Sequence, residues 1–566
     1  MKPPRWQALP PADESLTAAI AAEAGLSPIL ASIVARRTGS LEAARKWLRP
    51  LDVPLCDPMA LGGMAEAVAR IQQALAHHEP ITVYGDYDTD GITATTLLVN
   101  ALQSLGATVK PFFPDRATEG YGLTPAAVQR CLTYPPKPKL IITVDCGITS
   151  VDEVAWLAEQ GVETVVTDHH LPPAVLPNAI SIVNPRLSAP LEAREMCGCA
   201  TAFTLVRALA QAGAPLNPET FLDLVAVASI ADVMELTGDN RTLVVQGLRA
   251  MSTAKPGNAG LRALLRALKL PAKPGEALTS ERLAFAVVPC INAAGRLGQL
   301  KKAWLLLGMG RPEAAPQLLS INEERRTLER ALTAELLEQL ESEPPAANPG
   351  TQVLLCHNPA YAGVLGIAAA RIMELVGRPV AILCADEVAQ SGHGSMRACG
   401  AWHAVSLLDS VKDLLVHYGG HAAAAGFAVR PGALGEFVAR LSQTATGPAE
   451  EMALTYDADL SYLPITLSLC KELTILEPCG NGNRQPVFRK GFTIDSLRAV
   501  GADGTHLSLR LLPDDGGPAL KAIWFSGAAH AAGWHVGDTL QALFTLEVDT
   551  FREPCPALRI VDATVV

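Results

Sequence analysis

Between residues 81 and 183 the chain alternates short apolar runs with segments of helical spacing, and this rhythm limits the possible folds more than any other feature. The apolar runs have the length of strands, and we predict five: Ile81–Tyr84, Thr108–Phe113, Leu140–Val144, Glu163–Thr167 and Ile180–Val183. Strands that alternate with helices favour a parallel, doubly wound α/β sheet. In such sheets ligands bind at the carboxyl ends of the strands, so the residues that follow each run become candidates for a functional site.

The first predicted strand runs into a turn with three alternating carboxylates, Asp86, Asp88 and Asp90, and a predicted helix follows it. Crowded carboxylates repel one another and raise one another's pKa unless a positive group holds them. A divalent metal ion that prefers oxygen ligands is the simplest such group. The alternative is a solvated acidic turn, because aspartate and glycine are common turn residues. This stretch alone does not decide between the two.

Three further segments carry acidic or imidazole side chains at or near the ends of predicted elements: Asp145; Asp168, His169 and His170; and Asp232. Carboxylates with one imidazole suit Mn²⁺ or Mg²⁺ better than Zn²⁺. Two such ions about 3.5–4 Å apart need a bridging carboxylate and support an in-line displacement at phosphorus, and Asp145 is well placed to bridge. Each residue alone would be interpreted as a cap or turn residue, but four such segments together favour a metal site.

The chain changes character at several points, which predicts a multidomain protein. The proline-rich stretch EPPAANPG follows a long charged helix predicted over 314–341, and short strands with turn signals dominate after residue 452. We expect five parts: a helical leader over 1–50, an α/β domain over 51–250, a helical extension with a connector helix over 251–345, a second α/β domain over 350–447 and a small β-barrel over 452–566.

Composition and charge restrict the class of protein. With 49% apolar and 18% charged residues, the chain is globular rather than disordered. The net charge of −11 means that any nucleic-acid site must be a local positive groove, with metal ions supplying part of the charge. The twelve cysteines include no CxxC pair, which argues against a four-cysteine zinc site and favours a reducing compartment. No stretch has the pattern of a signal peptide or a membrane span, so we predict a cytoplasmic protein.

Several strings in this chain resemble the motifs of a known enzyme superfamily. GDYDTDG (85–91), VDCGI (144–148), TDHH (167–170) and ASIADVMEL (228–236) resemble the four motifs of the DHH phosphoesterases. INAAGRLG (291–298), GSMR (394–397), GGHAAAAGF (419–427), LEPCGNGN (476–483) and the leader SIVARRTGSLEAARKWLRP (32–50) are similar to the RecJ family of single-strand-specific 5′→3′ DNA exonucleases. The resemblance covers nearly the whole chain. It implies a parallel-sheet DHH domain, a connector helix, a DHH-associated α/β domain that grips nucleic acid and a C-terminal OB-type barrel.

The resemblance also implies roles for the acidic cluster. His170 would contact the scissile phosphate, and Asp168 would orient a histidine without binding metal itself. Two Mn²⁺ or Mg²⁺ ions, bridged by Asp145, would be held by six ligands: Asp86, Asp88, Asp90, Asp145, His169 and Asp232. Many family members carry a histidine where this chain has Tyr84, which makes Asp86 the substitute ligand. Relatives also often carry a Trp-His pair in the second domain where this chain has Tyr361.

The resemblance assigns the binding of the DNA 5′ end to the second α/β domain. Ser395 and Arg397 match the family residues that hold the terminal 5′ phosphate, with Arg116 and Arg296 as co-ligands. A planar guanidinium group suits a phosphate geometrically. For any one of these arginines alone, ordinary surface pairing would be the better interpretation.

Backbone and aromatic groups add candidates for contact with nucleic acid. The turn at Gly419 and Gly420 can aim backbone amides at an anion, and His421 is either a phosphate donor or a plain turn histidine. Tyr121 is a candidate for base stacking near the active site. Single-strand binders also stack bases on aromatic residues of their barrels. Four aromatic residues are predicted on barrel strands: Phe488, Phe492, Trp524 and Phe525. For most of them we prefer a position in the barrel core.

The predicted function is single-strand-specific 5′→3′ exonuclease activity that hydrolyses phosphodiesters to 5′ mononucleotides in DNA repair and recombination. We expect a monomer that binds single-stranded DNA and works with a single-strand-binding protein and a repair helicase, without a membrane. One alternative is a DHH phosphodiesterase acting on short oligonucleotides or cyclic dinucleotides. Another is a non-catalytic Cdc45-like scaffold, which should show eroded ligand positions. The intact acidic and histidine positions and the leader, connector helix and barrel favour the exonuclease.

Overall fold

The computed structural model of the chain describes residues 6–115, 119–120, 122–253, 257–271, 276–342, 350–446, 453–501, 504–550 and 553–566. The chain divides into two units. The first unit comprises Met1–Val288 together with Ala453–Val566, and the second comprises Pro289–Met452.

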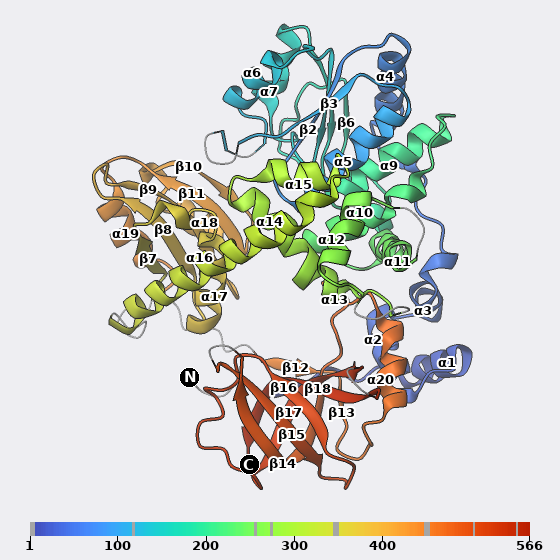
Figure 1. Cartoon of the computed structure of the whole chain (residues 1–566), viewed down its shortest axis with the longest axis vertical. Coiled ribbons are helices and arrows are strands. Elements are labelled where there is room, and N and C mark those ends of the chain that lie inside the picture. The colour runs from blue at the N-terminus through green and yellow to red at the C-terminus, as the bar shows by residue number, and fades with distance from the viewer. Residues whose placement is uncertain are drawn as a thin grey trace. The chain divides into compact units, whose positions relative to one another are not determined.

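The five strands predicted between residues 81 and 183 form one sheet of the first unit (Figure 1). All neighbouring strands are parallel. In spatial order the strands are β3 (Val109–Phe112), β2 (Ile81–Gly85), β4 (Leu140–Val144), β5 (Glu163–Thr167) and β6 (Ser181–Val183). The predicted parallel α/β class is confirmed.

Helices cover both faces of this sheet (Figure 1). One apolar cluster joins the sheet to α6 (Pro125–Thr133) and α7 (Val151–Glu159). On the other face lie α5 (Thr89–Ser104) and α9 (Gly198–Gln211), which also contact α10 (Leu222–Ala231). The first eight residues of α10 are buried, as expected for a helix that is apolar all round. The remaining α-helices of four or more residues in this region are α4 (Met64–Ala76), α8 (Pro185–Ser188), α11 (Gly238–Ser252) and α12 (Ala259–Ala267).

A closed five-stranded barrel forms the C-terminal part of the first unit, because β14 pairs with both β15 and β17. Its order is β14 (Phe488–Val500), β15 (His506–Pro513), β16 (Leu520–Trp524), β18 (Cys555–Val565) and β17 (Thr539–Asp549). Phe488, Phe492 and Trp524 lie in the barrel core, as the sequence favoured, whereas Phe525 is 52% exposed. The predicted OB-type barrel is therefore confirmed.

The leader packs on the barrel, a contact that the sequence did not predict. It contains α1 (Glu14–Ala24), α2 (Pro28–Thr38) and α3 (Leu41–Leu48), in agreement with the predicted helical leader. Ile33 and other apolar residues of α2 share one core with the barrel strands and with α20 (Leu467–Leu473). An additional strand, β1 (Trp6–Ala8), pairs in parallel with β12 (Leu454–Tyr456), about 450 residues later in the chain.

The second unit contains a mixed sheet in the order β10 (Leu415–Gly420), β11 (Ala424–Val429), β9 (Ser391–Arg397), β8 (Val380–Asp386) and β7 (Gln352–Cys356). Only β7 and β8 are parallel to each other. The long helix α16 (Ala315–Ser342) and α17 (Leu365–Val376) share one apolar core with β7 and β8. A second core includes α18 (Ala404–Asp409) and α19 (Leu434–Ser442). Two further helices of this region are α14 (Val288–Arg296) and α15 (Leu300–Leu307).

Two negative findings concern the described part of the chain. No single helix there is long and apolar enough to cross a membrane, although the bent pair α1 and α2 together meets the criteria of length and composition. None of the twelve cysteines forms a disulfide within these residues.

The shared core of leader and barrel makes a prediction for stability. Ile33 is 1% exposed, so Ile33→Ala removes apolar contacts and leaves a cavity, which should cost about 2–4 kcal/mol of unfolding free energy. The readout is the urea midpoint of the barrel transition in the full chain. Val536→Ala is the matched control, because Val536 is 64% exposed and should change the free energy by no more than about 0.5 kcal/mol. Equal midpoints for the two variants would contradict the shared core.

Candidate metal centre

The candidate centre lies where three parallel strands end side by side. Gly85, Val144 and Thr167 are paired across β2, β4 and β5. The next residue after each is acidic: Asp86, Asp145 and Asp168. All three are buried, with 3%, 2% and 1% exposure, although a lone carboxylate is rarely buried without a partner. Strand register alone therefore brings three distant acidic residues to one sheet edge.

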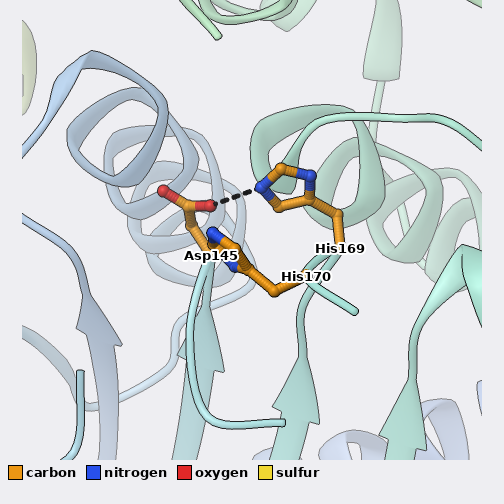
Figure 2. A group of neighbouring side chains, drawn as sticks. All are labelled: Asp145, His169 and His170. Atoms are coloured by element: carbon orange, nitrogen blue, oxygen red, sulfur yellow. Dashed lines mark ion pairs between the residues drawn. The ribbon is translucent and has the colours of Figure 1, made fainter. Parts of the chain in front are cut away.

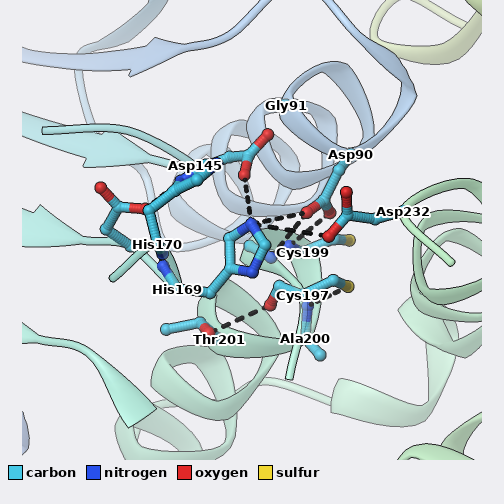
Figure 3. Close-up of polar contacts among 12 residues, drawn as sticks. Asp90, Gly91, Asp145, His169, His170, Cys197, Cys199, Ala200, Thr201 and Asp232 are labelled. Carbon is cyan, nitrogen blue, oxygen red and sulfur yellow. Dashed lines mark hydrogen bonds and ion pairs between the residues drawn. The ribbon is translucent and has the colours of Figure 1, made fainter. Parts of the chain in front are cut away.

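His169 lies among carboxylates that come from three different elements (Figure 3). Its Nε2 atom is 3.0 Å from Asp145 Oδ1, 3.6 Å from Asp232 Oδ2 and 3.8 Å from Asp90 Oδ2. Asp90 belongs to the first turn of α5, and Asp232 follows the last residue of α10. The predicted convergence of these four residues is thus present in the structure.

Three overlapping groups in this cluster have donor atoms within 4.8 Å of one another. The first is Asp86, Asp88 and Asp145, and the second is Asp90, His169 and Asp232. Asp145 appears again in the third group, with both histidines (Figure 2). Asp145 is shared by the first and third groups, and its Oδ1 lies 3.0 Å from Nε2 of His169, a member of the second group, which is the geometry expected of a bridging carboxylate.

The backbone at Asp145 has an unusual conformation that the sequence did not reveal. Its φ angle is +62°, in the left-handed region that aspartate tolerates better than most residues but still rarely occupies. The amide of Asp145 donates to Thr167 O at 3.1 Å. Strained backbone of this kind tends to gather at functional sites, and here it belongs to the residue that links the two groups.

Asp90 is held by the amino end of α9. Its Oδ2 accepts a 2.6 Å hydrogen bond from the Gly198 amide, and its Oδ1 accepts a 2.8 Å bond from the Cys199 amide. A carboxylate at a helix N-terminus is favoured by the helix dipole and satisfies amides that lack helical partners. A Cβ atom on Gly198 would lie 2.5 Å from Asp145 Cβ, so only glycine allows this approach. Sequence reasoning missed both residues.

Asp168 fixes the orientation of His170. Its Oδ1 accepts a 2.8 Å hydrogen bond from His170 Nδ1 and further bonds from the amides of His169 and His170. Its Oδ2 accepts a 2.9 Å bond from the Ile148 amide. A buried carboxylate bound to one imidazole nitrogen sets the tautomer and angle of the ring. This is the contact predicted for Asp168, with His170 as its histidine.

Asp88 has a structural role in addition to its place in the cluster. It is the N-cap residue of α5, and its Oδ1 accepts a 3.0 Å hydrogen bond from the Gly91 amide. The helix-cap interpretation considered for single aspartates therefore holds for Asp88. The cap occupies one carboxylate oxygen and is compatible with the group formed with Asp86 and Asp145.

Electrostatics in the cluster favour a bound cation. Burial raises the pKa of Asp145 well above its usual value, and the neighbouring carboxylates, above all Asp90, raise it further. The same two causes raise the pKa of Asp232 to about 8. Burial also raises the pKa of Asp90 and lowers the pKa of His169 to about 4. A divalent cation would offset this repulsion, and oxygen ligands with one imidazole fit Mn²⁺ or Mg²⁺. His170 differs: burial opposes its charge, but the hydrogen bond to Asp168 raises its pKa to about 9.

Tyr84 and Tyr361, the two positions expected to depart from the family motifs, have packing roles. The Tyr84 side chain is fully buried, its ring centroid lies 4.9 Å from that of Phe112, and its hydroxyl donates to Gly122 O at 2.9 Å. Tyr361 is 8% exposed and packs in the core that includes α16 and α17.

A second predicted site lies in the second unit, at the start of α17. Arg397 Nη1 donates to Ser395 Oγ at 2.8 Å and to Met396 O at 2.9 Å. A Cβ atom on Gly366 of α17 would lie 2.6 Å from Arg397 Nη2 and 3.0 Å from Ser395 Oγ, so the pair lies against this helix. Burial lowers the pKa of Arg397, and no carboxylate among the described residues forms an ion pair with it. A partly buried guanidinium in this situation suits an anionic ligand.

Of the other residues predicted to contact phosphate or DNA, the structure describes Arg296, Gly420 and His421. Arg296 Nη1 lies 3.5 Å from Gly363 O, two residues before α17, so Arg296 is close to the same helix start. Gly420 belongs to strand β10 and pairs with Ala425, which differs from the predicted turn. The amide of exposed His421 donates to Ala424 O at 2.7 Å. Arg116 and Tyr121 lie outside the described residues.

Three family models match this chain in sequence order. The N-terminal domain of the DHH family matches residues 80–229, the DHHA1 domain matches residues 350–447, and the RecJ OB domain matches residues 456–561.

Two curated relatives carry the name single-stranded-DNA-specific exonuclease RecJ. The protein from Thermus thermophilus is 38% identical over 472 residues, which are 81% of this chain and 66% of that protein, so the chain spans just under two thirds of its length. The protein from Escherichia coli is 31% identical over 562 residues, which are 94% of each chain.

Two crystal structures of RecJ from Thermus thermophilus share this fold. The structure described as a complex with Mn²⁺ has a TM-score of 0.83 at 32% identity and covers 99% of this chain and 79% of that chain. The structure described as a complex with Mg²⁺ has a TM-score of 0.76 at 31% identity and covers 99% of this chain and 78% of that chain. Because a relative more than 30% identical is matched over nearly its full length, and the fold and domain order agree, the chain belongs to the RecJ family.

Proposed function

We propose that this protein is a metal-dependent exonuclease that hydrolyses single-stranded DNA from its 5′ end and releases 5′ mononucleotides. The observation that carries the proposal is Asp145, a buried carboxylate on left-handed backbone that links two groups of metal-type donors. The names of the curated relatives support the substrate, and the Mn²⁺ and Mg²⁺ complexes of the related structures support the metals.

Two Mn²⁺ or Mg²⁺ ions are the proposed cofactors. The ligands that we assign to one ion are Asp86, Asp88 and Asp145. Those that we assign to the other are Asp90, His169 and Asp232, with Asp145 shared. When bound, such ions lower the pKa of a coordinated water and stabilise charge on the attacking and leaving oxygens.

The protein's own contribution to the chemistry is orientation and proton placement. His170 belongs to the group with Asp145 and His169, and its Nδ1 is bound to Asp168. From this position its imidazole would contact a phosphate oxygen at the scissile bond. The negative charge of Asp168 stabilises the imidazolium form, so a hydrogen bond to the developing charge on that phosphate is favoured.

The 5′→3′ polarity of the proposed reaction depends on the second unit. We assign the terminal 5′ phosphate to Ser395 and Arg397, with Arg296 nearby at the start of α17. The support is a partly buried guanidinium that forms no ion pair with a described carboxylate. Recognition of the terminal phosphate would make the enzyme begin at a 5′ end.

The wider setting is also part of the proposal. A role in DNA repair and recombination, with a single-strand-binding protein and a repair helicase as partners, rests on family membership. Monomeric state and cytoplasmic location stay predictions from the sequence. A phosphodiesterase acting on short oligonucleotides is the second candidate, but the leader and OB barrel favour a long single strand.

Removing the linking carboxylate should abolish turnover. Asp145→Asn keeps the shape of the side chain but loses the charge that both ions share, so we expect activity to fall by roughly 100-fold or more. The assay is digestion of a single-stranded oligonucleotide labelled at its 3′ end, with Mn²⁺ and with a chelator. Asp152→Asn, on the exposed side of α7, is the control. Near-normal activity of Asp145→Asn, or products that are not shortened from the 5′ end, would contradict the proposal.

Asp168→Asn should slow the chemical step without weakening DNA binding. The amide retains the size of the carboxylate but cannot stabilise a charged His170, so kcat should fall by about 10–100-fold while KM changes little. Calorimetric Mn²⁺ affinity should stay near that of the wild type, because Asp168 is not an assigned ligand. A large loss of Mn²⁺ affinity would contradict the assignment of Asp168 to the orientation of His170 alone.

Arg397→Ala should remove the preference for a phosphorylated 5′ end. Charge-assisted hydrogen bonds of about 1.5–3 kcal/mol correspond to a preference of roughly 10–100-fold for 5′-phosphate over 5′-hydroxyl oligonucleotides. Competition between the two oligonucleotides measures this ratio directly. The exposed Arg371 of α17 supplies the control variant Arg371→Ala. An unchanged ratio in Arg397→Ala would remove Arg397 from the 5′ site.

A further inference from the structure

The loop that leads into the barrel contacts the chain directly after Asp232. This lead-in loop comprises residues 476–483. Asn481 Nδ2 donates a 3.0 Å hydrogen bond to Val233 O, and Leu236 N donates a 2.9 Å bond to Asn481 O. One asparagine thus bonds through both its side chain and its backbone to a segment about 250 residues earlier.

Asp232 is only partly buried, and it differs from the buried carboxylates of the cluster in how it is held. Asp90 and Asp168 each accept hydrogen bonds from backbone amides through both oxygens. No described residue donates a hydrogen bond to the buried Oδ2 atom of Asp232, which lies 3.6 Å from His169 Nε2 (Figure 3). The position of this carboxylate therefore depends on the backbone at the end of α10.

That backbone contains an unfavourable residue. Val233 has a φ angle of +55°, and its side chain is 64% exposed, so side-chain packing does not hold it there. The Met234 amide bonds to Ser229 O at 3.0 Å, as in a helix C-cap that usually places glycine at this left-handed position. A β-branched residue is a genuine outlier in this conformation. The hydrogen bond from Asn481 to the Val233 carbonyl is a contact that stabilises this left-handed conformation.

The lead-in loop is itself fixed in place. Arg241, 3% exposed, donates to Leu476 O, Glu477 O and Pro478 O at 3.0–3.4 Å, and its guanidinium lies 3.8 Å from the centroid of the Trp47 ring. Asn483 Nδ2 donates to Leu476 O and to Pro478 O, at 2.7 Å each. Because these hydrogen bonds fix the lead-in loop, the loop can restrain the segment after Asp232.

Gly480, the residue before Asn481, lies in close contact with Leu236, and this contact requires a glycine. A Cβ atom on Gly480 would lie 2.9 Å from Leu236 Cδ1. Leu236 is 2% exposed, so it has little room to give way. Gly480 therefore lets the lead-in loop lie directly on the segment after Asp232.

We propose that Asn481 is a positioning residue for Asp232, and that the lead-in loop completes the group of Asp90, His169 and Asp232. The inference rests on the proposed function, because it takes Asp232 as a metal ligand. Without the Asn481 side chain, Val233 leaves the left-handed conformation more readily, and the Asp232 carboxylate moves relative to His169. The barrel then affects the metal site through the side-chain hydrogen bond of Asn481 as well as through any contact with DNA.

Calorimetric titration of the full chain with Mn²⁺ tests this inference. Asn481→Ala should weaken the binding of one of two ions by about tenfold or more, the loss typical of outer-shell partners, and leave the other unchanged. Arg484→Ala is the matched control, because Arg484 is exposed and adjacent to the loop. The melting temperature of the barrel, measured in the same samples, separates this effect from unfolding.

A second variant makes the test specific for backbone positioning. Glycine adopts the left-handed conformation readily, so Val233→Gly in the Asn481→Ala background should recover most of the lost Mn²⁺ affinity. Wild-type affinity in Asn481→Ala, or no recovery in the double variant, would overturn the inference.

The experiment also separates this inference from the proposed function. Wild-type protein that binds two ions but digests no single-stranded DNA would refute the exonuclease and leave the Asn481 result standing. Wild-type protein that binds no Mn²⁺ would overturn both.

Discussion

Repulsion among buried carboxylates at one sheet edge is the constraint on which the rest of the structure depends. Parallel pairing of β2, β4 and β5 ends the three strands in register, so Asp86, Asp145 and Asp168 must lie side by side. Burial removes the water that would screen them, and the pKa of Asp145 rises well above its usual value. A fold that keeps such a cluster needs positive charge at that edge. Helix amides and one imidazolium supply part of it, and divalent cations are the natural source of the remainder.

The supports of the carboxylates divide the cluster into two kinds of residue. Asp90 and Asp168 are fixed by amides close to them in space and resist movement even without metal. Asp145 and Asp232 lie at or next to unusual backbone, at Asp145 itself and at Val233. These two residues flank His169 Nε2 and therefore decide how far apart the donor groups lie. Distant parts of the chain, including the lead-in loop, can influence the centre mainly through this second kind of residue.

The sequence predicted the elements that depend on local pattern. Apolar runs marked all five strands of the first sheet, and the polar residues after them marked Asp145, Asp168 and His169, because strand ends of a parallel sheet must converge. It could not predict contacts that depend on tertiary packing. The amides of Gly198 and Cys199, the left-handed Asp145 and Val233, and the bond from Asn481 carry no periodic signal. The packing of Ile33 on the barrel and of Tyr84 against Phe112 was missed for the same reason.

Anomalous diffraction from a crystal soaked in Mn²⁺ tests the central claim most directly, namely that Asp145 links two metal sites. The account predicts two peaks about 3.5–4 Å apart with an oxygen of Asp145 between them. It further predicts that Asp86 and Asp88 lie beside one peak, and that His169 and Asp232 lie beside the other. A single peak, or two peaks that do not share Asp145, would contradict the account.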